Sequence, residues 1–330
     1  MRSGIIILIG VVILILIGLI IGLWVKKNHF QIIPNNSEDR TTNSPIDAVV
    51  TWVDSTTPQW IRSYEKSTGK NFKQSQKDHL YRWSPPKANP DDELSICLEL
   101  IRKNMPWVRN TYVVTADSSQ QPKCIKNEII IHHDVLGIGP VFNSHAIESS
   151  LHRIPGLSEN FIYLNDDVYV RKPVQPEHFF SDGIPLARVS TFRPVRDMDK
   201  WSDLLLYTAH VTGEINALKP DHTPHALTKS LMYEGEYNFP KYWKNTRNCK
   251  VRYDCEFEVS PIIMAYHFGL SRGTIKNAKN QPDPDRLKYI YATTISSCEN
   301  KASAIKKSHI VCVNSLDGNK TALKRVLQID

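Results

Sequence analysis

Length, composition and charge set broad limits on this chain. It has 330 residues, of which 41% are hydrophobic and 23% are charged, and its formal net charge at pH 7 is +7. This length suits one large α/β domain or two small ones, with a substantial core, and the composition is ordinary for a globular protein. The basic residues form no long run, and no helix-turn-helix, zinc-finger or RNA-binding signature accompanies them, so we expect no nucleic-acid partner. The charge favours anionic substrates, although a solvated basic surface is the stronger alternative.

The amino terminus has the pattern of a membrane anchor. The chain is uncharged and apolar from Gly4 to Val25, and about 20 such residues are enough for a helix to cross a bilayer. A cleaved signal peptide would have a shorter apolar run and a small-residue cleavage site. We therefore predict a cytoplasmic tip and an uncleaved transmembrane helix over residues 1–27. Gly18 and Gly22 have the GxxxG spacing that can pair two membrane helices. This spacing could form a homodimer, and the alternative is that the two glycines are incidental.

A polar segment separates this anchor from the rest of the chain. Residues 28–45 are predicted to form a flexible stem, and residues 46–330 the folded domain. The six cysteines all follow the anchor, and an even number permits disulfides in an oxidising lumen. Cys249 and Cys255 are close enough for a local bridge. These features predict a single-pass membrane protein with a lumenal, Golgi-like type II domain, although similar charges on both sides of the anchor leave its orientation open.

Strand and helix patterns alternate along the folded domain. Buried strands are predicted at residues 47–53, 111–115, 128–132 and 161–164, and helices at residues 93–104 and 144–153. This alternation predicts an α/β fold with a mostly parallel, Rossmann-like sheet flanked by helices. Residues 172–245 are rich in proline and aromatic residues, so we expect an irregular lid or acceptor surface there.

The segment from Phe142 to Val170 carries the most informative pattern. A short helix and a turn precede a buried strand that ends in Asn165-Asp166-Asp167. In open α/β sheets the ligand crevice lies beyond the carboxyl ends of the strands. Two adjacent carboxylates are costly to hold there unless a cation lies between them, so the pattern indicates a divalent metal that carries a phosphorylated substrate. The plainer alternative is that both aspartates cap the next turn.

This run, FNSHAIESSLHRIPGLSENFIYLNDDVYV, resembles the second conserved region of the Stealth family. That family contains bacterial capsular polysaccharide phosphotransferases and the animal lysosomal-enzyme N-acetylglucosamine-1-phosphotransferase. The other regions are resembled, in the family's order, by IDAVVTWVDST from residue 46, DHTPHALTKSL from 221 with KVRYDCEFEVS from 250, and HIVCVNSLDGN from 309. The resemblance covers residues 46 to 320 and implies a GT-A-like nucleotide-sugar-binding fold.

The resemblance also implies an activity. We expect a phosphotransferase of polysaccharide biosynthesis that moves a hexose-1-phosphate, such as GlcNAc-1-phosphate, from a UDP-sugar to a glycan hydroxyl. The reaction would release UMP and use Mg²⁺ or Mn²⁺. Two alternatives stay open: a GT-A-type glycosyltransferase that releases UDP, and a non-catalytic membrane-anchored protein that binds glycans.

Matched residues suggest where the nucleotide binds. Thr51, Trp52 and Asp54 end the first predicted strand, where a nucleotide would lie. Trp52 offers an aromatic face to uracil, and Asp54 an acceptor for the ribose or base; the alternative is that Trp52 packs in the core. In the fourth region Asn314 matches the family, but Ser315 replaces its aspartate.

The chemical roles fall on the second and third regions. Asp166 and Asp167 match the paired aspartates of the family: one would bind the metal at the donor diphosphate, and the other would accept the proton of the attacking hydroxyl. His225 is a candidate general base or phosphate contact, and Arg252 a phosphate ligand, unless it forms a surface ion pair. Further contacts to the substrate or to the metal ligands, or alternatively caps of a helix, would come from three other matched residues: Asn143, Ser144 and Glu148.

Overall fold

The structure is a computed structural model, and it describes residues 44–73, 91–193, 199–280, 288–292, 295–313 and 320–329. The predicted anchor, residues 1–27, and nearly all of the predicted stem lie outside these residues. Among the described residues, no helix has the length and apolar character needed to span a bilayer.

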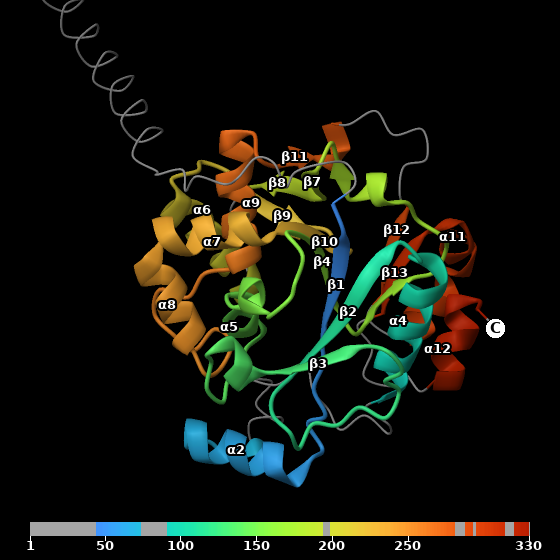
Figure 1. Ribbon diagram of the computed structural model, residues 1–330, viewed down its shortest axis with the longest axis horizontal. Coiled ribbons are helices and arrows are strands. Elements are labelled where there is room, and N and C mark those ends of the chain that lie inside the picture. The colour runs from blue at the N-terminus through green and yellow to red at the C-terminus, as the bar shows by residue number, and fades with distance from the viewer. Residues whose placement is uncertain are drawn as a thin grey trace, which may run out of the picture. The chain divides into compact units, whose positions relative to one another are not determined.

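The main sheet, within the described residues, has five strands in the order β10-β4-β1-β2-β3 (Figure 1). The strands are β1 Ile46–Thr51, β2 Val108–Thr115, β3 Ile129–His132, β4 Asn160–Asn165 and β10 His225–Thr228. Strands β1 to β4 run parallel to one another, and β10 is antiparallel to β4. The mostly parallel sheet predicted from the sequence is therefore confirmed.

The central strands are apolar because helices cover both faces of the sheet. β1 reads IDAVVT and β4 reads NFIYLN, and all but the last residue of each strand are buried. Such runs are typical of parallel strands between two helical layers. The four parallel strands end at one edge, and β10 begins there, because His225 pairs with Tyr163 near the end of β4. We call this the carboxyl edge.

Most of the helices form two groups, one on each side of β1 and β2 in Figure 1, and α2 lies apart from both in this view. One group contains α4 and α12, which pack on each other, and the other contains α5, α7, α8 and α9. The α-helices are α2 Pro58–Thr68, α4 Asp91–Asn104, α5 Ser144–Glu148, α6 Lys200–Thr212, α7 Lys229–Asn238, α8 Pro240–Asn248, α9 Pro261–Arg272, α10 Ile295–Asn300, α11 Ala302–Lys307 and α12 Lys320–Leu327. Short 3-10 helices cover His133–Leu136, Leu151–Arg153, Pro176–His178 and Ala278–Asn280.

Small sheets surround the main one. Their strands are β5 Val168–Val170, β6 Phe180–Ser181, β7 Ile184–Ala187, β8 Val189–Phe192, β9 Ala217–Pro220, β11 Lys276–Asn277, β12 Tyr289–Ala292 and β13 Ile310–Val313. The sheet β12-β13-β5 matters most for the site, because β5 begins directly after Asp167. The backbone N–H of Val313 donates to the carbonyl oxygen of Asp167 at 3.0 Å, which joins the turn after β4 to β13.

Two expectations about local structure are wrong. Residues 172–245 are not irregular: their described part holds β6 to β10 and α6 to α8. Proline was misleading because Pro240 is the first residue of α8, where its missing N–H removes no helical hydrogen bond. The helix predicted over residues 144–153 is interrupted after Glu148, where the Ser149 hydroxyl donates to the carbonyl oxygen of Ala146 and competes with the helical pattern.

A buried carboxylate holds the opposite edge of the sheet. Asp47 in β1 is fully buried and accepts hydrogen bonds from Arg109 Nε at 2.9 Å and Arg109 Nη2 at 2.6 Å. It also accepts from the backbone N–H of Asn110 at 3.1 Å and of Ser158 at 2.7 Å. The β1–β2 register shifts between Ile46 and Ala48, so Asp47 fastens an irregular part of this pairing and the segment that leads into β4.

We expect Asp47→Ala to lower the free energy of unfolding by about 2–4 kcal/mol, because it leaves the backbone N–H groups of Asn110 and Ser158 without their acceptor. Urea denaturation measures the change. The control is Glu299→Ala, which removes an exposed ion pair with Arg325 and should change stability by less than about 0.5 kcal/mol. Equal effects of the two substitutions would contradict this account.

Candidate functional site

A cavity of about 530 Å³ opens at the carboxyl edge of the main sheet. Its walls come from the ends of β1 and β4, the start of α5, the first residue of β10 and the loop after α8. Nine of the residues predicted from the sequence line it: Thr51, Trp52, Asn143, Ser144, Glu148, Asp166, Asp167, His225 and Arg252. Segments far apart in the chain thus meet where the parallel strands end.

Two predicted residues are not part of this wall. Asp54 does not line the cavity; its carboxylate accepts from Thr56 N at 2.8 Å and Thr56 Oγ1 at 2.6 Å. Its backbone is held by the side-chain amide of Gln120. Asp54 therefore shapes the turn before α2, and the predicted ribose or base contact has no geometric support. Asn314 lies outside the described residues.

Asp167, in the turn after β4, is held by a contact from β13. Cys312 Sγ in β13 donates to Asp167 Oδ2 at 3.6 Å. Burial, and then the neighbouring Asp167, raise the pKa of the Cys312 thiol well above its usual value, so the thiol keeps the proton that it donates. The next side chain, Asp166, lines the same cavity, and so does Glu93 of α4. Three carboxyl groups therefore border this part of the edge.

These residues fit a Mg²⁺ or Mn²⁺ ion that arrives with a substrate. Within the described ranges, no group of three or more His, Cys, Asp or Glu side chains is arranged as a complete metal site. Mg²⁺ is commonly held by one or two carboxylates together with substrate phosphates and water. Asp166 and Asp167 would supply that part of the ligand set, and a diphosphate would supply the rest.

The charge of the cavity favours the same interpretation. Its wall contains the basic side chains Lys219 and Arg252 and a larger set of carboxyl side chains: Glu93, Glu148, Asp166, Asp167, Asp199 and Asp221. A diphosphate entering such a wall is repelled unless a cation offsets the carboxylates.

A hydrogen-bond network supports the floor of the cavity. The Tyr163 hydroxyl lies 3.1 Å from Thr51 Oγ1 and donates to Asn165 Oδ1 at 2.9 Å. It is also 3.5 Å from Glu148 Oε1. Burial raises the pKa of both Glu148 and Tyr163, so both groups hold their protons more firmly than in water. Thr51 and Glu148 are thus joined through one phenol, an arrangement that orients them.

Asn143 and Ser144, two of the predicted site residues, also have structural roles at the start of α5. Asn143 Oδ1 accepts from the backbone N–H of His145 at 3.0 Å and caps the helix, as the alternative interpretation held. The Ser144 hydroxyl accepts a hydrogen bond from Arg252 Nη2. Ser144 therefore orients the guanidinium that the sequence analysis assigned to phosphate.

His225 is the first residue of β10 and lines the same cavity as the two aspartates. Its ring stacks on that of Tyr163, with centroids 6.3 Å apart, and its Nδ1 is 3.3 Å from the Tyr266 hydroxyl. Burial, and then the neighbouring His222, lower the pKa of His225 to about 4. The imidazole is therefore neutral at pH 7; it can accept a proton but is a weaker base than a free histidine.

Aromatic residues around the cavity differ from expectation. The Trp52 side chain is only 6% exposed and packs in the hydrophobic core, which leaves little ring face for a base.

The sequence did not predict several other residues that line the cavity: Glu93, Asn165, Asp199, Trp201, Lys219, Tyr253 and Tyr291. The sequence offered one signal for Glu93, which is a charged residue directly before the apolar Leu94 in the predicted helix.

The pKa of His225 predicts a pH effect on stability. An unfolded histidine titrates near 6.5, so between pH 6.5 and about 4 the unfolded chain binds a proton that the folded chain does not. The free energy of unfolding should therefore fall as the pH decreases through this window. His225→Gln should reduce that fall, measured by urea denaturation at pH 7, 5.5 and 4.5; parallel curves for the two proteins would refute the assignment.

Comparisons with known proteins agree with the resemblance in sequence. The family model "Stealth protein CR2, conserved region 2" matches residues 87–186. A capsular polysaccharide phosphotransferase of Neisseria meningitidis serogroup B is 33% identical over 253 residues, which are 70% of this chain and 66% of that protein. An exopolysaccharide phosphotransferase of Streptomyces coelicolor is 32% identical over 247 residues, 69% of this chain and 44% of that protein. The chain thus spans less than two thirds of the length of these relatives.

Among solved structures, a galactosyltransferase, LgtC, in complex with donor and acceptor sugar analogs matches with a TM-score of 0.39 and 10% identity. The match covers 81% of this chain and 86% of that one. A TM-score this low supports no conclusion about fold or chemistry.

Proposed function

Because this chain belongs to the Stealth family, we propose that it is a glycan phosphotransferase that moves a hexose-1-phosphate from a UDP-sugar to a glycan hydroxyl. GlcNAc-1-phosphate is the group that we would test first. The related proteins are named polysaccharide phosphotransferases, which supports this class of reaction. One observation carries the proposal: Asp166 and Asp167 directly follow β4 and line a cavity that is also lined by Arg252 and His225.

The proposed reaction transfers the β-phosphoryl group of the donor together with the sugar that it carries. An oxygen of the acceptor hydroxyl attacks the β-phosphorus of the donor, the bond from that phosphorus to the bridging oxygen breaks, and UMP leaves. The hydroxyl proton passes to the carboxylate of Asp167 or to the neutral imidazole of His225. Both groups line the cavity, and the neutral imidazole of His225 does not have to lose a proton first.

The other residues hold the phosphates. A divalent cation on Asp166 and Asp167 would neutralise the charge of the diphosphate. Arg252 places a planar guanidinium at the same cavity, and such a fork binds two phosphate oxygens and never loses its charge. Ser144 fixes the direction of this guanidinium, and Thr51 is fixed through Tyr163. Phosphoryl transfer depends mainly on such positioning and charge balance.

The compartment and the assembly are proposals from the sequence. A single-pass anchor at residues 1–27 would place the domain in a Golgi-like lumen, and paired anchors would make a homodimer. The disulfide between Cys249 and Cys255 supports an oxidising compartment.

The released nucleotide tests the reaction. The full chain in detergent is incubated with a panel of nucleotide sugars, a glycan acceptor and Mg²⁺ or Mn²⁺, and the products are identified by mass spectrometry. We expect UMP and a glycan that carries a sugar phosphodiester. Release of UDP would instead identify a glycosyltransferase, and glycan binding without any nucleotide release would identify a binding protein.

We expect Asp167→Ala and His225→Ala each to reduce turnover by at least about a hundredfold, because each removes a candidate proton acceptor. Excess EDTA should abolish turnover of the unchanged protein, and Mg²⁺ should restore it. Asp203→Asn is the control, since Asp203 is exposed on α6 outside the cavity wall. Near-normal turnover of folded Asp167→Ala or His225→Ala would remove the substituted residue from the mechanism.

A further inference from the structure

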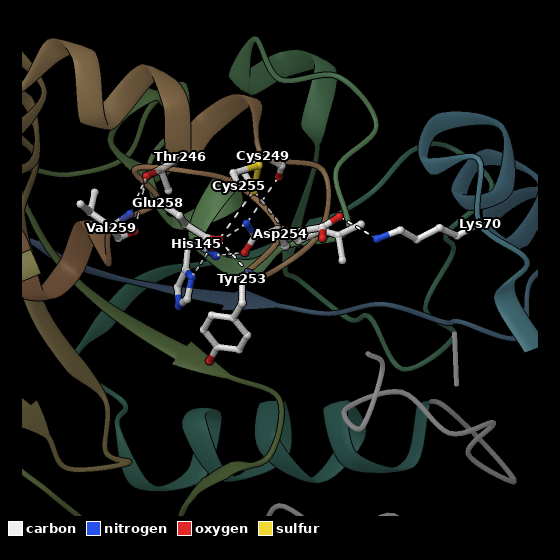
Figure 2. Close-up of a disulfide and its surroundings, with 11 residues drawn as sticks. Lys70, His145, Thr246, Cys249, Tyr253, Asp254, Cys255, Glu258 and Val259 are labelled. Atoms are coloured by element: carbon white, nitrogen blue, oxygen red, sulfur yellow. Dashed lines mark hydrogen bonds and ion pairs between the residues drawn. A yellow bond between two sulfur atoms is a disulfide. The ribbon is translucent and has the colours of Figure 1, made fainter. Parts of the chain in front are cut away.

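A loop closed by a disulfide forms one wall of the cavity. Cys249 and Cys255 are bonded, with their Cα atoms 5.8 Å apart (Figure 2). Between them lie Arg252 and Tyr253, which both line the cavity. The backbone N–H of Phe142 donates to the carbonyl oxygen of Lys250 at 2.8 Å, so this loop runs beside the segment that leads into α5. The local bridge predicted from the sequence is confirmed.

The backbone at Tyr253 explains how two consecutive side chains reach one cavity. In an extended chain, neighbouring side chains point to opposite sides. Tyr253 has a φ of 62°, in the left-handed region that an aromatic residue rarely adopts. This conformation costs about 1–2 kcal/mol and persists only where the surroundings enforce it. The reversal lets the Tyr253 ring join the Arg252 guanidinium, which lies 5.5 Å from the ring centroid.

Glu258 supplies the contact that enforces this conformation. It is 4% exposed, and its Oε2 accepts from the backbone N–H of Tyr253 at 2.7 Å (Figure 2). Its Oε1 accepts from Asn143 Nδ2 at 2.9 Å and from His145 Nδ1 at 2.8 Å. One buried carboxylate thus joins the disulfide loop to the first turn of α5.

The same two segments meet a second time at the cavity itself. Arg252 of the loop donates to the hydroxyl of Ser144, the first residue of α5. A shift of the loop relative to α5 would therefore move the guanidinium from its place in the cavity wall. Glu258 does not line the cavity, so it acts on the cavity through Tyr253 and Arg252.

We propose that Glu258 is a positioning residue which, together with the Cys249–Cys255 disulfide, holds Arg252 against the phosphate that is transferred. The inference rests on the proposed function for the identity of the ligand. It assigns a role to a buried carboxylate that contacts neither the nucleotide nor the metal. It also makes the affinity of the cavity for phosphate depend on the redox state of one loop.

The first experiment measures Glu258→Gln. We expect kcat to fall about tenfold or more and the donor KM to rise. The side chain of glutamine has one oxygen where glutamate has two, so one of the hydrogen bonds that Glu258 accepts is lost. Circular dichroism should show a folded protein. The control is Glu236→Gln. Glu236 is a partly buried carboxylate that His152, Arg153 and Arg247 bind outside the cavity, so its substitution should lower Tm while leaving kcat unchanged.

A double-mutant cycle separates positioning from general destabilisation. In an Arg252→Lys background, Glu258→Gln should weaken the binding of Mg²⁺-pyrophosphate by less than twofold, because the guanidinium that Glu258 positions has already been replaced. Additive effects of the two substitutions would overturn the proposal. Cys249→Ser with Cys255→Ser should reproduce the loss, and dithiothreitol should reduce the activity of the unchanged protein but not of this pair.

Binding of Mg²⁺-pyrophosphate, followed by calorimetry, gives a readout that does not need the reaction. Glu258→Gln and the paired serine variant should each bind it at least about fivefold more weakly than the unchanged protein, and equal affinity would overturn the inference. If the unchanged protein releases no UMP from any donor, the proposed function fails, while the calorimetric comparison still decides the role of Glu258.

Discussion

The repulsion between neighbouring carboxyl groups is the constraint on which the site depends. Asp166 and Asp167 follow each other at the end of a buried strand, and Glu93 borders the same cavity. Keeping these groups together without a counter-charge is unfavourable in a partly buried place. A cavity of this kind is suited to a ligand that brings positive charge with it, and a metal-bound diphosphate is such a ligand.

The surrounding structure keeps that repulsion from opening the turn. β5 leaves the turn and pairs with β13, while the thiol of Cys312 and the N–H of Val313 both donate to Asp167. α4 packs against β5. Contacts from β13 therefore hold Asp167, and α4 supports the strand that follows it.

The sequence predicted the main sheet well, for a physical reason. Buried parallel strands are continuous apolar runs, and their carboxyl ends must meet, so a polar cluster after such a run indicates a site. The prediction failed where position in the chain is a poor guide to position in space. Pro240, for example, suggested irregular structure but is the first residue of α8. Asp54 follows a strand, as many site residues do, yet its carboxylate accepts a hydrogen bond from Thr56 and does not line the cavity.

Glu258 shows a second limit. Its importance comes from three donors on two segments, and two of them lie more than a hundred positions away. No local pattern reports such contacts. Trp52 is a related case, because the same tryptophan in the same motif can stack on a ligand or fill the core, and only packing decides.

The two ends of β1 have different duties. Asp47 secures the sheet at one end, and Thr51 faces the cavity at the other, about 13 Å away at the usual rise of a strand. Sites at this distance with no shared partners respond independently to substitution. Evolution could therefore vary the ligand chosen at the cavity without loosening the fold, and a protein engineer could reinforce the far edge first and then alter the chemistry.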